Sequence, residues 1–377
     1  MADRQVSSED PPCAPDCGTE PASPDVAAAL AGLDLDQAAA AAAAAAGEGL
    51  EGESAADDAD DDTGGAAAEQ PPEERRAAVF AGPEWNAPPP AMYDYETEYR
   101  GADGQLNDDE HKAVLRGKVT NIPARLFKLR GPDYLCGDKL NNLALKQPSG
   151  TAAYACVALK VFQSSSNLTH GAQKIGPLKD YLAKLAAFDA QHGTPGGDAP
   201  MYLIASWTFS NFFKTEYTSV VHVLRRTMKI DSSGTGDDPA LDRAFSRWLA
   251  LSNEQKNDKL KYACIVRESN EQLKSAISML GGERPVLIGK RLTTSYFRGD
   301  NYLEVNMDVG SSNVASMLNG LVLKTSGKLV IDECWCIEGQ AADELPERAL
   351  CAVRWNNCSI EGCRQLLDRD GSLAASK

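Results

Sequence analysis

Residues 295–312 read SYFRGDNYLEVNMDVGSS, and this stretch sets the expectation for the fold. Apolar and polar side chains alternate over residues 302–309, which is the pattern of a half-buried strand. The apolar members share one face: Leu303, Val305, Met307 and Val309. Gly310 then ends the strand, and Ser311 or Ser312 can cap a following helix through its hydroxyl group. The stretch therefore predicts a strand with a core-facing side, a turn and a helix.

Polar side chains gather on the other face of this strand and at its two ends: Arg298, Asp300, Asn301, Glu304, Asn306 and Asp308. Backbone N–H groups and the dipole at a helix N-terminus suit an anion. Four residues are therefore candidate ligands for an anion or a lipid head group: Arg298, Asn301, Ser311 and Ser312. The alternative is a solvated sheet face with a helix cap, and the carboxylates of Glu304 and Asp308 would repel an anion.

The Arg-Gly-Asp triplet at residues 298–300 opens a strand, and nothing in the sequence places it outside a cell. An adhesion motif is therefore not predicted. The segment 130–135 repeats the RG-x-x-YL pattern of residues 298–303. One echo of this length does not establish a repeat. One interpretation is a turn used twice, with Gly131 and Gly299 supplying a backbone angle that other residues avoid.

Charge is unevenly distributed along the chain of 377 residues, whose formal net charge is −16. Residues 1–100 hold 23 Asp and Glu against 4 Lys and Arg, and the remainder is close to neutral. The first segment has an alanine run and no aromatic residue before Phe80, so it buries too little apolar surface to offset its ordering entropy. Residues 1–92 are predicted to be disordered, and this acidic arm is a candidate site for protein partners. Nucleic acid is not an expected partner.

The rest of the chain predicts a linker or loosely ordered segment at 93–119, one domain at 120–366 and a tail at 367–377. Seven strands follow from alternation or β-rich composition: 153–163, 201–210, 217–226, 259–268, 301–309, 328–338 and 350–357. Four helices are predicted: 176–191, 239–252, 270–280 and 311–323. Because strands outnumber helices without regular alternation, we expect an α+β fold. Its largely antiparallel, curved sheet would carry helices packed on one face.

The residue types that perform catalysis are sparse. His222 lies in a predicted strand and is expected to be structural, and no nucleophile, zinc-protease or phosphate-loop motif is present. Cys334 and Cys336 share a strand face and are better explained as buried thiols than as zinc ligands. The acids of EGQAADELPER (338–348) are expected in a loop or short helix rather than in an acid–base pair. We therefore predict no enzyme activity, no cofactor and no metal.

Two basic clusters are too small to form a membrane-binding patch alone, since such a patch usually holds four to eight Lys or Arg. They are Arg125, Lys128 and Arg130, and Arg225, Arg226 and Lys229. Folding could join them. No apolar run has the length of a membrane span or the form of a signal peptide. The scattered cysteines predict reduced thiols, so a cytoplasmic location is expected.

Three segments resemble a known family: FKLRGPDYL (127–135), PVLIGKRLTTSYFRGDNYLEVNMDVGSSNVASML (285–318) and LVIDECWCIEGQAADELPERAL (329–350). They are similar to the C-terminal domain of the plant protein Enhanced Disease Resistance 2 and its relatives. The resemblance spans roughly residues 120–365. The positions that carry its motifs are Arg130, Gly131, Tyr134, Leu135, Arg298, Gly299, Asp300, Asn301, Tyr302, Asp308, Gly310, Ser311, Ser312, Glu338, Glu344, Pro346, Glu347 and Arg348.

The resemblance implies a non-enzymatic, lipid-associated or regulatory module linked to membrane lipid signalling and control of cell death. It also implies peripheral placement at endomembranes or the plasma membrane. In plants the domain often follows a pleckstrin-homology domain and a START domain, whereas a stand-alone version is expected here. Lipid would occupy a groove beside the sheet. The alternative is a protein-interaction domain with no small ligand, and the resemblance supplies no catalytic residue.

Overall fold

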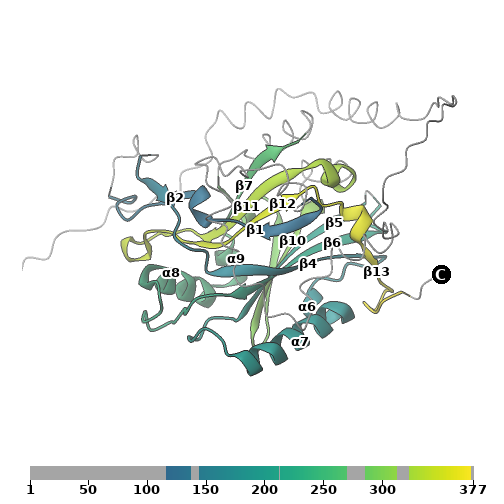
Figure 1. The fold of residues 1–377 in the computed structure, drawn as a ribbon, viewed down its shortest axis with the longest axis horizontal. Coiled ribbons are helices and arrows are strands. Elements are labelled where there is room, and N and C mark those ends of the chain that lie inside the picture. The colour runs from purple at the N-terminus through teal and green to yellow at the C-terminus, as the bar shows by residue number, and fades with distance from the viewer. Residues whose placement is uncertain (1–115, 137–143, 212, 270–284, 312–321, 375–377) are drawn as a thin grey trace, which may run out of the picture. The chain divides into compact units, whose positions relative to one another are not determined.

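The computed structural model describes residues 116–136, 144–211, 213–269, 285–311 and 322–374 (Figure 1). Its strands form two curved sheets and one short ribbon, and most neighbouring strands run antiparallel. The predicted α+β class with a largely antiparallel curved sheet is confirmed, although the strands are divided between two sheets. Four predictions lie mostly or wholly outside the described residues: the disordered arm at 1–92, the linker at 93–119 and the helices at 270–280 and 311–323.

One sheet has five strands in the order β1-β12-β11-β7-β8, and each pair in it is antiparallel. Its strands are β1 (Lys118–Asn121), β7 (Leu260–Glu268), β8 (Val286–Leu287), β11 (Val330–Ile337) and β12 (Ala349–Asn356). A separate ribbon consists of β2 (Lys128–Arg130) and β3 (Lys146–Pro148). Ile122, Phe127 and Leu129 pack on one face of the five-stranded sheet, together with Cys334 and Cys336. This packing holds the ribbon beside that face.

The other sheet has six strands in the order β13-β4-β6-β5-β10-β9. Its strands are β4 (Tyr154–Ser164), β5 (Tyr202–Ser210), β6 (Tyr217–Arg226), β9 (Thr293–Arg298), β10 (Tyr302–Asp308) and β13 (Gln365–Leu366). Two pairs are parallel, β10 with β5 and β13 with β4, and the others are antiparallel. The β9–β10 hairpin thus extends an antiparallel meander through one parallel pairing.

Two helices of three or more turns are described, and they occupy different places. α7 (Gly176–His192) packs Leu178 and Leu182 against Ile204 and Val223 of the six-stranded sheet. α8 (Pro239–Ala250) begins at Asp238, whose carboxylate accepts hydrogen bonds from the N–H groups of residues 240 and 241. This cap satisfies two of the backbone donors that a helix start leaves free.

Short helical segments complete the described elements. The α-helical ones are α6 (Gly171–Lys174), α9 (Asn253–Lys256) and α12 (Ile360–Cys363). The 3₁₀ turns are η1 (Ala124–Leu126), η3 (Ile288–Lys290), η4 (Val309–Ser311), η5 (Ser326–Lys328) and η6 (Ala342–Glu344). Of the predicted helix at 311–323, only residues 311, 322 and 323 are described.

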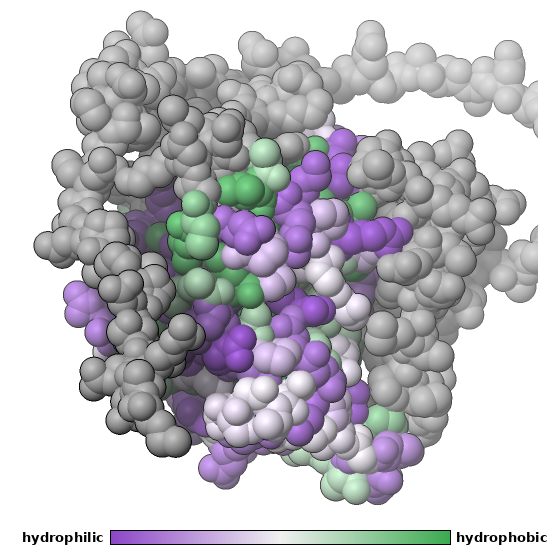
Figure 2. Space-filling view, turned by 90° about the vertical axis from the view of Figure 1, so that its left-hand side faces the viewer, coloured by the Kyte–Doolittle hydropathy of each residue, from purple (hydrophilic) through white to green (hydrophobic). Residues whose placement is uncertain are grey.

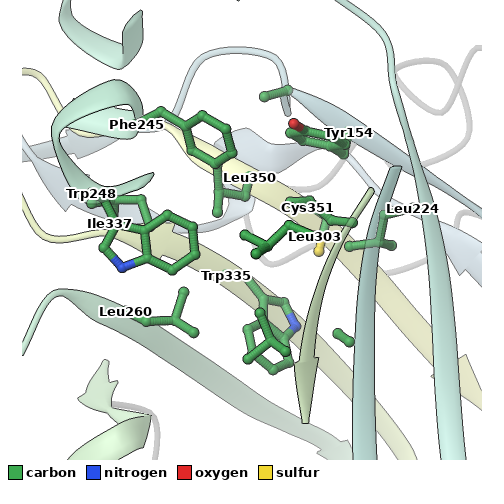
Figure 3. Packing of buried hydrophobic residues seen from close by; sticks show 14 of the residues in the cluster. Tyr154, Leu224, Phe245, Trp248, Leu260, Leu303, Trp335, Ile337, Leu350 and Cys351 are labelled. Carbon is green, nitrogen blue, oxygen red and sulfur yellow. The ribbon is translucent and has the colours of Figure 1, made fainter. Parts of the chain in front are cut away.

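The two sheets and α8 share one hydrophobic core (Figure 3). In it, Phe245 and Trp248 of α8 lie beside Trp335 and Leu350 of the five-stranded sheet and Leu303 of the six-stranded sheet. Each large apolar side chain buried in this way contributes about 1.5 to 3 kcal/mol to stability. The core therefore fixes α8, and the loops around it, against the ends of both sheets.

β10 confirms one half of the expectation for the opening stretch and corrects the other. The predicted apolar face lies in the core: Leu303, Val305, Met307 and Val309. The expected solvated polar face is wrong, because Glu304 is 0% exposed and Asn306 is 5% exposed. α6 covers this face, and the N–H groups of Gly171 and Ala172 donate to the Glu304 carboxylate at 2.7 and 3.0 Å. A helix N-terminus does hold an anion here, but the anion is the protein's own carboxylate.

Seven predicted strands are confirmed to within about two residues, as are the helices at 176–191 and 239–252. The strands that were missed are short or lie at edges: β1, β2, β3, β8, β9 and β13. A run of two to six residues is too short to show a periodic pattern. Residues 367–374 of the predicted tail are described, and Gly371 accepts a hydrogen bond from the N–H of Gly176 at the start of α7.

Candidate functional site

A pocket of about 400 Å³ lies where the β2–β3 ribbon meets the start of β7 and the loop between β11 and β12. We call it the cationic pocket, and its lining residues are Lys128, Leu129, Arg130, Tyr134, Lys146, Lys261, Pro285, Glu338 and Glu347. Figure 2 shows the end of the molecule that carries β2 and α8, where hydrophilic side chains surround a smaller hydrophobic group. Four cationic side chains face two carboxylates in this pocket, a balance of +2.

Glu347 is the buried centre of the pocket, with a side chain only 1% exposed. Its carboxylate accepts hydrogen bonds from the ammonium of Lys261 at 2.5 Å, from the N–H of Gly339 at 3.0 Å and from the N–H of Arg130 at 3.2 Å. A buried carboxylate needs this degree of pairing, because an unpaired one would cost several kcal/mol. Glu347 is therefore fully committed to the protein's own donors.

Arg130 links the ribbon to the loop after β11. Its guanidinium forms a salt bridge with Glu338 at 3.0 Å, donates to the carbonyl of Gly339 at 3.0 Å, and lies 4.7 Å from the centre of the Tyr134 ring. An arginine over an aromatic ring gains a cation–π attraction. The two acids of the pocket are thus occupied, Glu338 by Arg130 and Glu347 chiefly by Lys261.

These pairs leave two cations of the pocket without a salt bridge to a described residue: Lys128, which is exposed, and Lys146, which is half-buried. Lys146 lies directly opposite Arg130 in the β2–β3 ladder. Like charges placed opposite each other across two strands are destabilising. Burial and the nearby positive charge of Lys261 lower the pKa of Lys146. A bound anion would relieve both the repulsion and the unfavourable charge.

The four residues proposed from sequence as anion ligands are not all brought together. Arg298 and Asn301 line a second pocket at the β9–β10 turn. Ser311 lies at the opposite end of this hairpin, where its hydroxyl donates to the carbonyl of Asp308 and accepts from the N–H of Thr293 at 2.8 Å. Ser312 lies outside the described residues. Ser311 therefore closes a turn, and it lies far from Arg298 along the hairpin.

The two RG-x-x-YL segments do not form the same turn, which corrects that interpretation. In the first, the N–H of Tyr134 donates to the carbonyl of Gly131; in the second, the N–H of Gly299 donates to the carbonyl of Tyr302. Neither glycine has a positive φ. Both are required for space, since a Cβ would lie 2.5 Å from the carbonyl oxygen of residue 145 at Gly131 and 2.2 Å from the Tyr302 ring at Gly299.

The motif residues of EGQAADELPER divide into two groups. Glu338 and Glu347 line the cationic pocket. The others fasten the loop to α8 and β7: Glu344 pairs with Arg247 and Lys259, Arg348 pairs with Asp238, and Pro346 follows a cis peptide bond. The expectation of a loop or short helix is confirmed, since the segment is a loop that contains the 3₁₀ turn η6. The loop that shapes the pocket is therefore held by salt bridges on both sides.

Sequence reasoning found Lys128 and Arg130 as a basic cluster but missed Lys146 and Lys261. The fold does not bring the second basic cluster into the same pocket: Arg225 pairs with Asp189 at 2.5 Å, and Arg226 lines the other pocket. Lys146 lies in a three-residue strand, and Lys261 is a buried lysine at the start of β7. Only the pairing of the strands reveals their convergence.

Four cysteines of β11, β12 and the segment after β12 are buried. Cys334 and Cys336 are 1% and 2% exposed, and Cys351 and Cys358 are also buried, which confirms the prediction of buried thiols. Burial raises the pKa values of all four thiols. No group of three His, Cys, Asp or Glu side chains in the described ranges is arranged to hold a metal ion.

The fold and the pocket define a class: a two-sheet α+β domain with a cationic pocket at one edge. A family model described as "Protein ENHANCED DISEASE RESISTANCE 2, C-terminal" matches residues 120–359, and the chain belongs to this family. A curated relative, "Protein ENHANCED DISEASE RESISTANCE 2-like" from Arabidopsis thaliana, is 26% identical over 236 residues, which cover 62% of this chain and 28% of the relative. No solved structure matches the chain.

None of the helices described here is both long and apolar enough to cross a bilayer.

Proposed function

We propose that this domain is a non-enzymatic lipid-associated module that binds the anionic head group of a membrane lipid in the cationic pocket. The observation that carries the proposal is Lys146, a partly buried cation opposite Arg130 with no salt bridge to a described residue. The acids of the pocket are already paired, so a phosphate group is the missing negative charge. Such a group binds Lys and Arg through charge-assisted hydrogen bonds.

The surroundings of the pocket suit a lipid better than a free ion. Leu129, Tyr134 and Pro285 supply apolar and aromatic surface beside the cations. Leu135, the next residue after Tyr134, is 44% exposed, and it is one of four large hydrophobic side chains exposed in the described residues. An apolar side chain beside a cationic patch can enter the interfacial region of a bilayer while the cations contact head groups. Peripheral membrane placement on the cytoplasmic side is part of the proposal.

Vesicle co-sedimentation with the full chain tests this function. We expect binding to phosphatidylcholine vesicles that contain an anionic phospholipid, and little binding to phosphatidylcholine alone. Lys146→Met should weaken binding about fivefold, because one lysine near an anionic surface contributes about 1 kcal/mol. Lys184→Met on the exposed side of α7 is the matched control and should bind as the parent does.

If the parent protein and both variants fail to bind vesicles of any composition, the lipid function is wrong. The alternative, a protein-interaction domain with no small ligand, would then be favoured. The acidic arm remains a predicted contact for protein partners in either case.

A further inference from the structure

A second pocket, of about 220 Å³, lies at the turn between β9 and β10. We call it the turn pocket, and its lining residues are Thr194, Gly197, Asp198, Ala199, Pro200, Met201, Arg226, Arg298, Gly299, Asp300 and Asn301. It has room for a tetrahedral oxyanion with several waters, since a water takes up about 30 Å³. Its lining residues come from the loop between α7 and β5, the end of β6 and the β9–β10 turn, so three segments converge on it.

Arg226 is the unusual group in this pocket. It is 3% exposed, and its two terminal nitrogens donate to the carbonyl oxygens of Ile230 and Pro195 at 3.1 and 3.0 Å. Its Nε has no hydrogen-bond partner, and the guanidinium forms no salt bridge with a described carboxylate. Carbonyl oxygens satisfy donors but do not neutralise a charge. Burying a cation without a counter-charge costs free energy, so an anion beside Arg226 would stabilise the protein.

Arg298 lies across the same pocket with its side chain exposed and unpaired among the described residues. The turn fixes its backbone, because the N–H of Gly299 donates to the carbonyl of Tyr302 at 3.0 Å. Asn301 uses its side-chain oxygen to accept from the N–H of Met201 at 3.3 Å, and its amide NH2 donates to no described residue. The turn therefore presents two groups of hydrogen-bond donors that are free among the described residues: the guanidinium of Arg298 and the side-chain NH2 of Asn301.

The acids of the pocket do not take these donors. Both oxygens of Asp198 accept hydrogen bonds from Ser232, one from its N–H at 2.9 Å and one from its hydroxyl. Asp300 is exposed at the tip of the turn and pairs with no described cation. Asp198 acts on Arg226 only at longer range. The Nε of Arg226 and the guanidinium of Arg298 thus remain available to a ligand.

We propose that the turn pocket binds a phosphate group, either free or carried by a lipid, between the guanidinium groups of Arg226 and Arg298. Arginine is suited to this ligand because its planar fork donates two parallel hydrogen bonds to an oxyanion. The amide of Asn301 supplies a further donor. This site is separate from the cationic pocket, and the proposal does not depend on the lipid function proposed above.

Phosphate binding is tested in a Lys146→Met background, which weakens the cationic pocket. Inorganic phosphate is titrated calorimetrically into the full-length Lys146→Met protein and into Lys146→Met/Arg298→Ala. We expect binding to the first, weakened about tenfold in the second, the effect of losing a charge-assisted contact. Arg298 is exposed, so its replacement should leave the fold intact. Lys146→Met/Arg291→Ala, which removes another exposed arginine, should bind as the background does.

Two outcomes would overturn the proposal: no phosphate binding to Lys146→Met, or equal binding with and without Arg298. Vesicles containing phosphatidate identify the source of the phosphate. If Arg298→Ala also weakens vesicle binding in this background, the ligand is a lipid head group. If only inorganic phosphate is affected, the ligand is a free phosphate compound. If Lys146→Met loses vesicle binding but still binds phosphate, vesicles and phosphate bind at different pockets.

Discussion

At the scale of single residues, a buried acid and a buried histidine meet between the two sheets. Glu333 of β11 accepts hydrogen bonds from the hydroxyl of Tyr262 at 2.7 Å and from the indole N–H of Trp355 at 3.0 Å. The Nε2 of His222 lies 3.5 Å from this carboxylate, and neither ring nitrogen has a hydrogen-bond partner. His222 was expected to be structural, and it lies in the core with Nε2 facing the Glu333 carboxylate.

The pKa values of this pair predict opposite pH dependences in two variants. Burial raises the pKa of Glu333 from 4.5 to about 7 and lowers that of His222 from 6.5 to about 4. The folded protein thus holds an extra proton on Glu333, and stability falls as the pH rises from 4.5 to about 7. The unfolded protein holds an extra proton on His222, and stability rises between about pH 4 and 6.5. In the parent the two effects largely cancel.

Chemical denaturation across this pH range checks the prediction. Glu333→Gln should become more stable as the pH rises from 4 to 6.5, by an amount on the order of 3 kcal/mol. His222→Leu should become less stable as the pH rises from 4.5 to 7. Two variants with the same slope would show that the pair does not titrate in this way.

Sequence alternation places Glu333 on the same side of its strand as Trp335, but it does not predict which residue of the other sheet contacts Glu333. His222 stands about a hundred residues earlier in the chain, and their meeting depends on how the sheets pack. The same limit applies to Lys146 and Lys261. Chemistry that depends on contacts between sheets therefore needs the tertiary structure.

At the scale of elements, Glu304 attaches α6 to the six-stranded sheet. Glu304→Ala should destabilise the protein by several kcal/mol, because it leaves two buried N–H groups, each costing about 1 to 3 kcal/mol. Glu304→Gln keeps one acceptor oxygen and should cost about half as much. Denaturant unfolding measures both, and hydrogen exchange at Gly171 and Ala172 should become faster. An alanine variant as stable as the parent would contradict this account of β10.

In the β2–β3 ribbon, we expect Lys146 to strengthen vesicle binding while lowering the stability of the ligand-free protein. Lys146→Met removes a like-charge pair with Arg130, so the ligand-free protein should be as stable as the parent or more stable by about 0.2 to 1 kcal/mol. Its vesicle binding should fall at the same time. Denaturation and co-sedimentation of the same preparation compare the two quantities. A variant that loses stability would indicate that Lys146 is structural.

β10 shows which properties of a strand can be predicted from its local sequence pattern and which cannot. Its limits, its core-facing side and the break at Gly310 all followed from the sequence. The burial of its polar side did not, because α6 comes from a segment more than a hundred residues away. The alternation of polar and apolar residues predicts a strand with one solvated face, and a covering helix removes that distinction.

At the scale of the whole molecule, the division of the strands into two sheets was not evident from their sequence. All seven longer strands were found, but their pairing depends on contacts such as β10 with β5 that join distant segments. The family was recognised from its motifs, and four of those motif positions converge on the cationic pocket: Arg130, Tyr134, Glu338 and Glu347.

Electrostatics at this scale predict a salt-dependent membrane interaction. The described cations of the pocket belong to a chain whose net negative charge comes from its first hundred positions. Vesicle binding should weaken as salt is raised from 0.1 to 0.5 M, since screening shortens the reach of exposed charges. Co-sedimentation at several salt concentrations measures this, and binding that is insensitive to salt would indicate mainly apolar contacts.

The most direct test of the central claim is the vesicle affinity of Lys146→Met beside that of the parent and Lys184→Met. All three are compared at one salt concentration, with folding checked by circular dichroism. We expect the parent and Lys184→Met to bind anionic vesicles equally and Lys146→Met to bind about fivefold more weakly. Equal binding by all three proteins would contradict the assignment of the cationic pocket as a lipid head-group site.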